Sequence, residues 1–178
     1  MSTVSDAVLA HLQPLIGLKL AIARRAADMR GFHFGEVRPH REGTVGEYAL
    51  HIQCAWRIDG QEGIVTGRSD LWEPAEVDAR VDWDHWDYEK DGNLQDKLIG
   101  ALLGGYDPKT RSFVNETSLL VVEAVEADAF GGATILLSGG YRLLLFPAGC
   151  NGEDWRVFRN RPDEPHFVVS GGRVETTE

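Results

Sequence analysis

The sequence has few of the features that mark secreted or membrane-spanning proteins. Only two of its 178 residues are cysteine, which excludes the disulfide framework that stabilises many small secreted domains. The first dozen residues contain neither Lys nor Arg, so they lack the charged region with which a signal peptide begins. The longest apolar run, residues 15–23, is interrupted by Lys19 and is far shorter than the roughly 20 residues of a membrane span. We therefore expect a cytoplasmic protein without a membrane partner.

Positive charge is scarce too. The chain has 18 Lys and Arg residues against 28 Asp and Glu residues, which gives a formal net charge of −10. Because the phosphate backbone is bound by net positive charge, this balance argues against a nucleic-acid partner and permits a basic protein partner. Most of the cations are Arg, a bias that is typical of GC-rich bacterial genomes.

The motifs of the common catalytic sites are missing. The chain contains no Gly-x-Ser-x-Gly, no phosphate loop ending in Gly-Lys-Ser/Thr, no Gly-x-Gly-x-x-Gly after a strand and no His-Glu-x-x-His. Residues 87–98 approach an EF-hand loop, but Leu98 stands where a bidentate acid is needed. We expect neither a metal nor an organic cofactor. Acid–base catalysis stays open, since it needs only two residues that the fold brings together.

The most informative segment runs from Tyr48 to Ile58. Apolar side chains occupy every second position, namely Leu50, Ile52, Cys54, Trp56 and Ile58. Because successive side chains of a strand face opposite sides of a sheet, the alternation predicts one continuous strand laid over a core, with Cys54 as a core residue. The opposite face then carries His51, Gln53 and Arg57, and Asp70 follows on the next turn.

The whole chain predicts one α+β domain of residues 1–178, with an antiparallel sheet of about seven strands and one or two covering helices. Short apolar runs separated by Gly-Gly turns indicate a meander in the last third of the chain. The expected order is a short N-terminal helix capped at Ser5-Asp6, strands to about residue 67, a loop rich in Trp and acids at 68–92, a helix at 93–104 and an antiparallel meander at 119–174.

Residues 48–58, followed by Gly67-Arg68-Ser69-Asp70, resemble a group of small bacterial proteins with a Leu-His-x-Gln-Cys-x-Trp-Arg strand and a Gly-x-x-Asp turn. Further matches to the group are residues 25–29, 34–35, 138–141, 153–156 and 166–169. The group is a domain of unknown function, so the resemblance implies no activity and no catalytic residue. In size and acidity the chain is also similar to the immunity proteins that neutralise polymorphic toxins, a likeness of general character and not of matched residues.

The loop at 68–92 motivates the leading functional hypothesis. It contains Trp72, Trp83 and Trp86 among many acids, and Trp is prominent in binding hot spots, although it also fills the space beneath long loops. We expect a non-enzymatic binding domain, immunity-like or regulatory, that engages a basic protein partner through this acidic, Trp-bearing surface.

The alternative is a small-ligand-binding or acid–base enzymatic domain. Its pocket would lie on the polar face of strand 48–58 and use His51, Gln53, Arg57 and Asp70. The Arg fork would bind an anionic group. An ordinary solvated sheet face explains the same residues, because antiparallel sheets commonly keep one wet face. A third possibility is a homodimer that pairs through sheet edges or the apolar loop.

Overall fold

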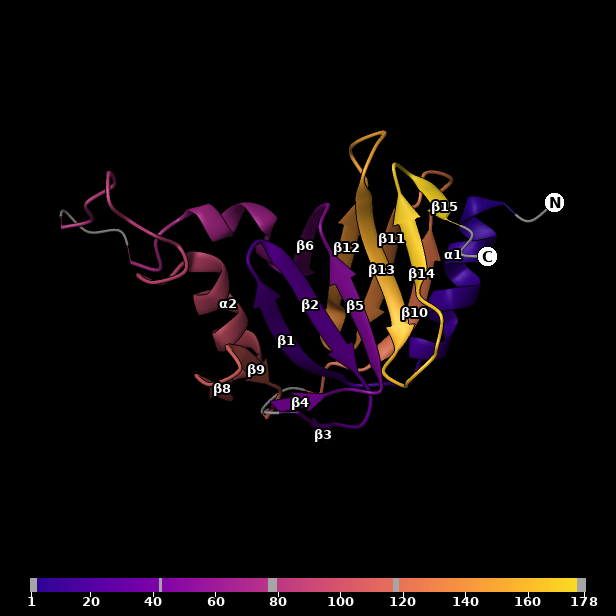
Figure 1. The fold of residues 1–178 in the computed structure, drawn as a ribbon, viewed down its shortest axis with the longest axis horizontal. Coiled ribbons are helices and arrows are strands. Elements are labelled where there is room, and N and C mark those ends of the chain that lie inside the picture. Colours follow the sequence, from indigo (N-terminus) through magenta and orange to yellow (C-terminus); the bar gives the residue numbers. More distant parts are fainter. Residues whose placement is uncertain (1–2, 42, 77–79, 117–118, 176–178) are drawn as a thin grey trace.

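The computed structural model describes residues 3–41, 43–76, 80–116 and 119–175. Within these ranges the chain forms two stacked antiparallel sheets and a small hairpin, with two α-helices at opposite ends of the molecule (Figure 1). This confirms the α+β class. The expected sheet of about seven strands is wrong: the described residues form fifteen strands in three sheets, because the strand runs fold into a sandwich.

The front sheet in Figure 1 has eight strands, in the spatial order β15 (Arg173–Glu175), β14 (Phe167–Ser170), β13 (Glu153–Arg159), β5 (Tyr48–Ile52), β2 (Met29–Phe34), β1 (Leu20–Ala26), β9 (Ser112–Val114), β8 (Tyr106–Asp107). The rear sheet has five strands, in the order β10 (Val122–Ala127), β11 (Ala133–Leu137), β12 (Tyr141–Phe146), β6 (Ala55–Gly60), β7 (Gly63–Gly67).

The predicted continuous strand 48–58 is wrong, because the chain crosses from one sheet to the other at Gln53 and Cys54. Strand β5 pairs with β2 and β13, whereas β6 pairs with β12 and β7. The backbone N–H groups of Gln53 and Cys54 both donate to the carbonyl of Asp154, at 2.8 and 2.9 Å. The crossing spans two residues, an even number, so the alternation of apolar side chains passes through it unchanged.

The core predicted from that alternation is confirmed. Leu50 and Ile52 point inward from the front sheet, while Trp56 and Ile58 point inward from the rear sheet, and all four are buried. Cys54, at the crossing, is only partly buried and packs against the edge of this core.

The predicted C-terminal meander is two meanders. Strands β10, β11 and β12 follow one another in the rear sheet, and β13, β14 and β15 follow one another in the front sheet. The chain crosses between the sheets after Phe146, just as it does after Ile52. Turn signals predict where strands end, but they do not say which sheet the next strand joins, and that decides the architecture.

Helix α1 (Val4–Leu12) continues into a 3-10 turn, η1 (Gln13–Leu15), and contributes Val8 and Leu12 to the core. Its N-cap is Thr3, not the predicted Ser5-Asp6. The Thr3 hydroxyl accepts a hydrogen bond from the Asp6 N–H, and the Asp6 carboxylate accepts one from the Thr3 N–H. The helix predicted over 93–104 is confirmed as α2 (Leu94–Leu103), with Asn93 as its N-cap.

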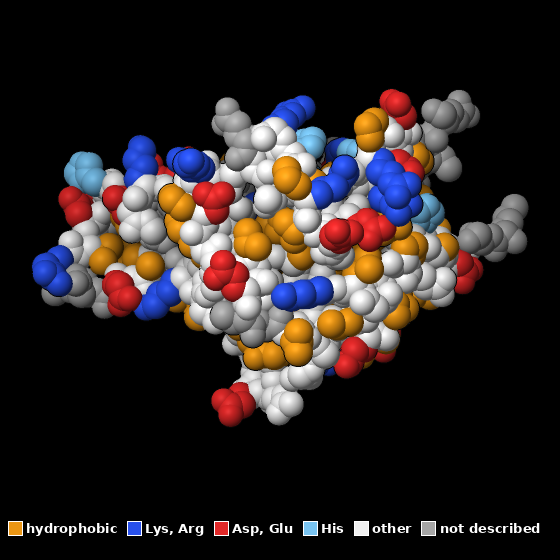
Figure 2. Space-filling model, turned by 90° about the horizontal axis from the view of Figure 1, so that it is seen from below, with side chains coloured by type: hydrophobic (Ala, Val, Ile, Leu, Met, Phe, Trp, Pro, Cys, Tyr) orange, Lys and Arg blue, Asp and Glu red, His pale blue; other side chains and the backbone are white. Residues whose placement is uncertain are grey.

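A small hairpin of β3 (Arg38–His40) and β4 (Gly43–Val45) lies at the lower end of the sandwich in Figure 1. It is tied to the outer face of the front sheet by a bond from Arg24 to the Thr44 carbonyl and by the Gly46 N–H, which donates to His33 Nδ1 at 3.2 Å. Figure 2 looks onto this end, where acidic, basic and apolar side chains are interspersed.

Residues 68–76 and 80–93, which we call the arm, project beyond the sandwich next to α2 (Figure 1). Apart from the 3-10 helix η2 (Arg68–Trp72) and an isolated β-bridge between Pro74 and Asn93, the described residues of the arm are turns and irregular backbone, as the sequence predicts. A further 3-10 turn, η3 (Ser138–Gly140), joins β11 to β12. Among the described residues, no helix is long and apolar enough to cross a membrane.

Candidate functional site

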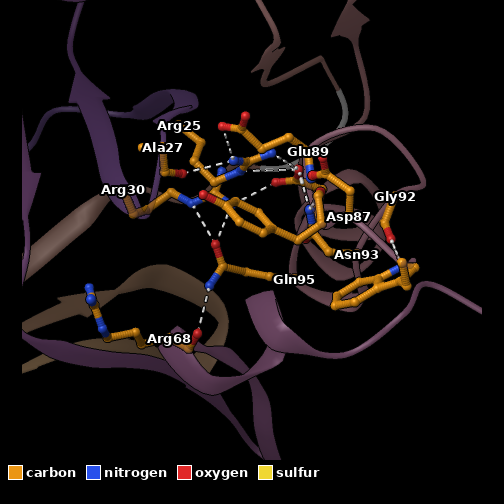
Figure 3. A network of polar contacts seen from close by, with 12 residues as sticks. Arg25, Ala27, Arg30, Arg68, Asp87, Glu89, Gly92, Asn93 and Gln95 are labelled. Atoms are coloured by element: carbon orange, nitrogen blue, oxygen red, sulfur yellow. Dashed lines mark hydrogen bonds and ion pairs between the residues drawn. The ribbon is translucent and has the colours of Figure 1, made fainter. Parts of the chain in front are cut away.

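The base of the arm is a network of charged side chains centred on Arg30 (Figure 3). Arg30 lies on β2 with none of its surface exposed. Its Nε donates to Gln95 Oε1 at 3.0 Å and its Nη2 donates to Asp96 Oδ1 at 2.7 Å. Gln95 in turn donates from Nε2 to the carbonyl of Gly67, at the end of β7, at 2.8 Å. The first turn of α2 therefore connects the front sheet to the rear sheet.

Arg25 binds the same carboxylate from the neighbouring strand. It stands directly opposite Arg30 in the β1–β2 pair, and its Nη2 lies 3.2 Å from Asp96 Oδ2. Burial opposes ionisation of Asp96, but the guanidinium groups of Arg30 and Arg25 outweigh it, so the pKa of this carboxyl is below its usual value. Two facing cations on one hairpin need such an anion, since like charges opposite each other are destabilising.

The arm is attached to the β1–β2 hairpin at both of its ends. At its start, Arg68 Nη2 lies 2.6 Å from a carboxylate oxygen of Asp28. At its end, the guanidinium of Arg25 lies 5.3 Å from the ring centroid of Tyr88 and 3.8 Å from Glu89 Oε1. These contacts attach both ends of the arm to the sandwich, next to the Arg30 network.

The indole rings of the arm remain largely in solvent. Trp72 is 48% exposed and Trp83 is 57% exposed. Trp72 packs edge-on against Tyr88, with ring centroids 5.0 Å apart, and Trp83 lies 6.3 Å from Trp86. Trp86 is half-buried and donates from Nε1 to the Gly92 carbonyl at 3.3 Å. The predicted partner residues therefore form two aromatic pairs on one projecting segment.

The arm is also acidic. Its residues, 68–76 and 80–93, contain eight acidic and three basic side chains in a chain of net charge −10. Asp82, Asp84 and Glu89 are exposed. Lys90 forms an ion pair with its neighbour Asp87 at 2.8 Å. The arm is thus strongly acidic around its exposed rings.

The four residues of the predicted ligand pocket do not come together. His51 lies on the outer face of β5, edge-on to Phe158 at 5.0 Å, where burial and the charge of Arg156 lower its pKa to about 4. Gln53 is nearby, because both residues act on Glu153. Side-chain hydrogen bonds from Arg156 and then Gln53, and the charge of His51, lower the pKa of the Glu153 carboxyl. His51 belongs to the front sheet, and Gln53 follows it at the crossing.

Arg57 and Asp70 belong to the other side of the crossing. Arg57 lies on β6 in the rear sheet, where its Nε donates to Asp59 Oδ1 at 2.8 Å. Asp70 accepts from the Thr66 hydroxyl and the Gly67 N–H, each at 2.9 Å, and so caps η2. Each side chain already has a structural partner, and the crossing at Gln53 and Cys54 separates the two pairs.

Comparison of the chain with protein-family models, curated proteins and solved structures gave no significant match. The resemblance to a bacterial domain of unknown function stays a prediction. Among the described residues, no group of three or more His, Cys, Asp or Glu side chains is placed to hold a metal ion.

Proposed function

We propose that the chain is a cytoplasmic binding domain, immunity-like or regulatory, that engages a basic protein partner through the arm. The main support is that exposed indole rings lie on a segment whose ends are held by charged contacts. Trp72 and Trp83 are about half exposed, yet both ends of the segment that holds them are attached to the β1–β2 hairpin, through Arg68 at the start and Arg25 at the end. Apolar rings in water with a well-defined support are typical of a preorganised binding surface.

The anchorage contributes to affinity by lowering the entropic cost of binding. A free loop would have to be ordered on contact, at a cost of about 0.5–1.5 kcal/mol for each immobilised side chain. Here Tyr88 is already held between Trp72 and Arg25. Truncation of a central Trp at an interface costs about 2 kcal/mol or more of binding free energy. Trp83 is more exposed than Trp72, so we expect its ring to contribute the most to binding of a partner.

The acids determine which partners are favoured. A segment with eight acidic and three basic residues attracts a basic protein over distances of about a Debye length, roughly 8 Å at physiological salt. Such complementarity chiefly raises the association rate and rejects acidic partners. Salt should therefore weaken the encounter more than it weakens the packing of the rings.

The experiment is affinity capture from bacterial lysates with three matched baits. The wild-type chain is compared with Trp83→Ala and with Phe130→Ala, which removes a 75% exposed ring from the turn between β10 and β11. We expect one stoichiometric basic protein on the wild type and on Phe130→Ala, and a loss of about thirtyfold or more in its affinity for Trp83→Ala. Equal capture by Trp83→Ala and the wild type would show that the arm is not the partner surface.

A further inference from the structure

A cavity of about 330 Å³ lies beside the first turns of α2, between the end of the arm and the β8–β9 hairpin. Its walls include three aromatic rings, Tyr88, Tyr106 and Phe113. Tyr106 is 57% exposed, and its ring centroid lies 5.0 Å from that of Phe113, which is buried. The volume falls in the range of about 300–1,000 Å³ that is typical of small-molecule sites.

The charge of this cavity is opposite to that of the chain as a whole. Four cationic side chains line it, against the two carboxylates of Glu89 and Asp96. The four are Arg25, Lys90, Lys97 and Arg111. The lining is therefore net positive, although the chain carries −10.

Arg111 is the cation that is best placed to receive a ligand. Arg25 is committed to Asp96, Lys97 to Glu76 at 2.6 Å, and Lys90 to Asp87. Within the described ranges, Arg111 makes neither a hydrogen bond nor an ion pair, and its side chain is exposed. A guanidinium presents a planar fork of donors that matches a carboxylate or a phosphate.

We propose that this cavity binds a small aromatic anion, a planar ring that bears a phosphate or a carboxylate. The exposed ring of Tyr106 supplies apolar surface for the planar group, and Arg111 binds the anionic group. The proposal goes beyond partner binding and does not depend on it. Because Tyr88 and Lys90 belong to the arm, an occupied cavity would also fix the end of the arm more firmly.

The test is calorimetric titration of the full chain with two probes of this chemistry, adenosine monophosphate and 4-hydroxybenzoate. Adenosine and inorganic phosphate are titrated separately, to distinguish recognition of the ring from recognition of the anion. We expect one site for at least one probe, and weaker binding of adenosine and of phosphate alone. Arg111→Gln should weaken the probe by about tenfold or more, because it removes a charge-assisted hydrogen bond.

Two matched variants control for general effects on charge and surface. Arg173→Gln removes an exposed Arg from β15 and is the control for Arg111→Gln. Tyr106→Ala removes the ring that packs on the ligand and should also weaken binding, and Phe130→Ala, which removes another exposed ring, is its control. Both controls should bind like the wild type, and all four variants should keep the wild-type melting temperature within a few degrees, since the residues changed are exposed. Failure of both probes to bind in the millimolar range would overturn the proposal, as would equal binding by Arg111→Gln and the wild type.

Discussion

Removal of the Asp96 carboxylate is the most direct perturbation of the arm's anchorage. In Asp96→Ala the guanidinium of Arg30, which has no exposed surface, would lose its only anionic partner among the described residues and keep only Gln95. Breaking a buried ion pair by deleting one partner costs about 3–5 kcal/mol. The Asp96 side chain is 28% exposed, so we expect the lower end of that range, about 3 kcal/mol of unfolding free energy.

The assay is urea denaturation at pH 7 of Asp96→Ala beside Asp84→Ala, an exposed acid of the arm that should cost less than about 0.5 kcal/mol. The pH dependence gives a second check. The folded pKa of Asp96 lies below its ordinary value of 3.8, so its contribution is complete above 3.8 and is lost as the pH falls through the folded pKa. A loss at pH 7 below about 1 kcal/mol, or a loss that does not shrink as the pH is lowered below 3.8, would show that the ion pair does not stabilise the fold in this way.

Two further predictions concern titratable groups elsewhere. Burial raises the pKa of the Cys54 thiol to about 12, whereas Cys150 is exposed. Iodoacetamide at pH 7.5 should therefore modify Cys150 far faster than Cys54, and peptide mapping that finds equal rates would contradict this. Burial also lowers the pKa of His33 to about 3 and of His51 to about 4, so the unfolded chain binds more protons below pH 6.5. Thermal stability should therefore fall as the pH drops from 6.5 toward 4, and His51→Gln should flatten that fall; an unchanged slope would count against the assignment.

Local patterns in the sequence predict the elements of this fold well. The alternation from Leu50 to Ile58 identifies the core side chains because burial on either sheet follows the same period of two. Asn93 identifies the start of α2, because an N-cap is a local interaction between a side chain and the next turn. The arm is recognisable because its Pro, acids and Trp fit neither period.

Contacts between distant segments could not be predicted in this way. The crossing at Gln53 leaves the alternation intact, so nothing in the pattern distinguishes one strand from two in different sheets. The meeting of Arg25 and Arg30 with Asp96 joins residues 71 and 66 positions apart. Arg25 and Arg30 lie on different strands, so a joint role for them follows only once β1 and β2 are paired. The one available signal is two cations in facing positions of a hairpin, which calls for an anion from elsewhere.

Binding kinetics with the protein that the wild-type chain captures would test whether the arm is the surface for a basic partner. Association and dissociation rates are measured by surface plasmon resonance at about 0.05 M and 0.5 M salt, for the wild type and Trp83→Ala. We expect salt to lower the association rate of both chains, and Trp83→Ala to raise the dissociation rate by about tenfold or more. A dissociation rate unchanged by Trp83→Ala, together with an association rate insensitive to salt, would contradict it.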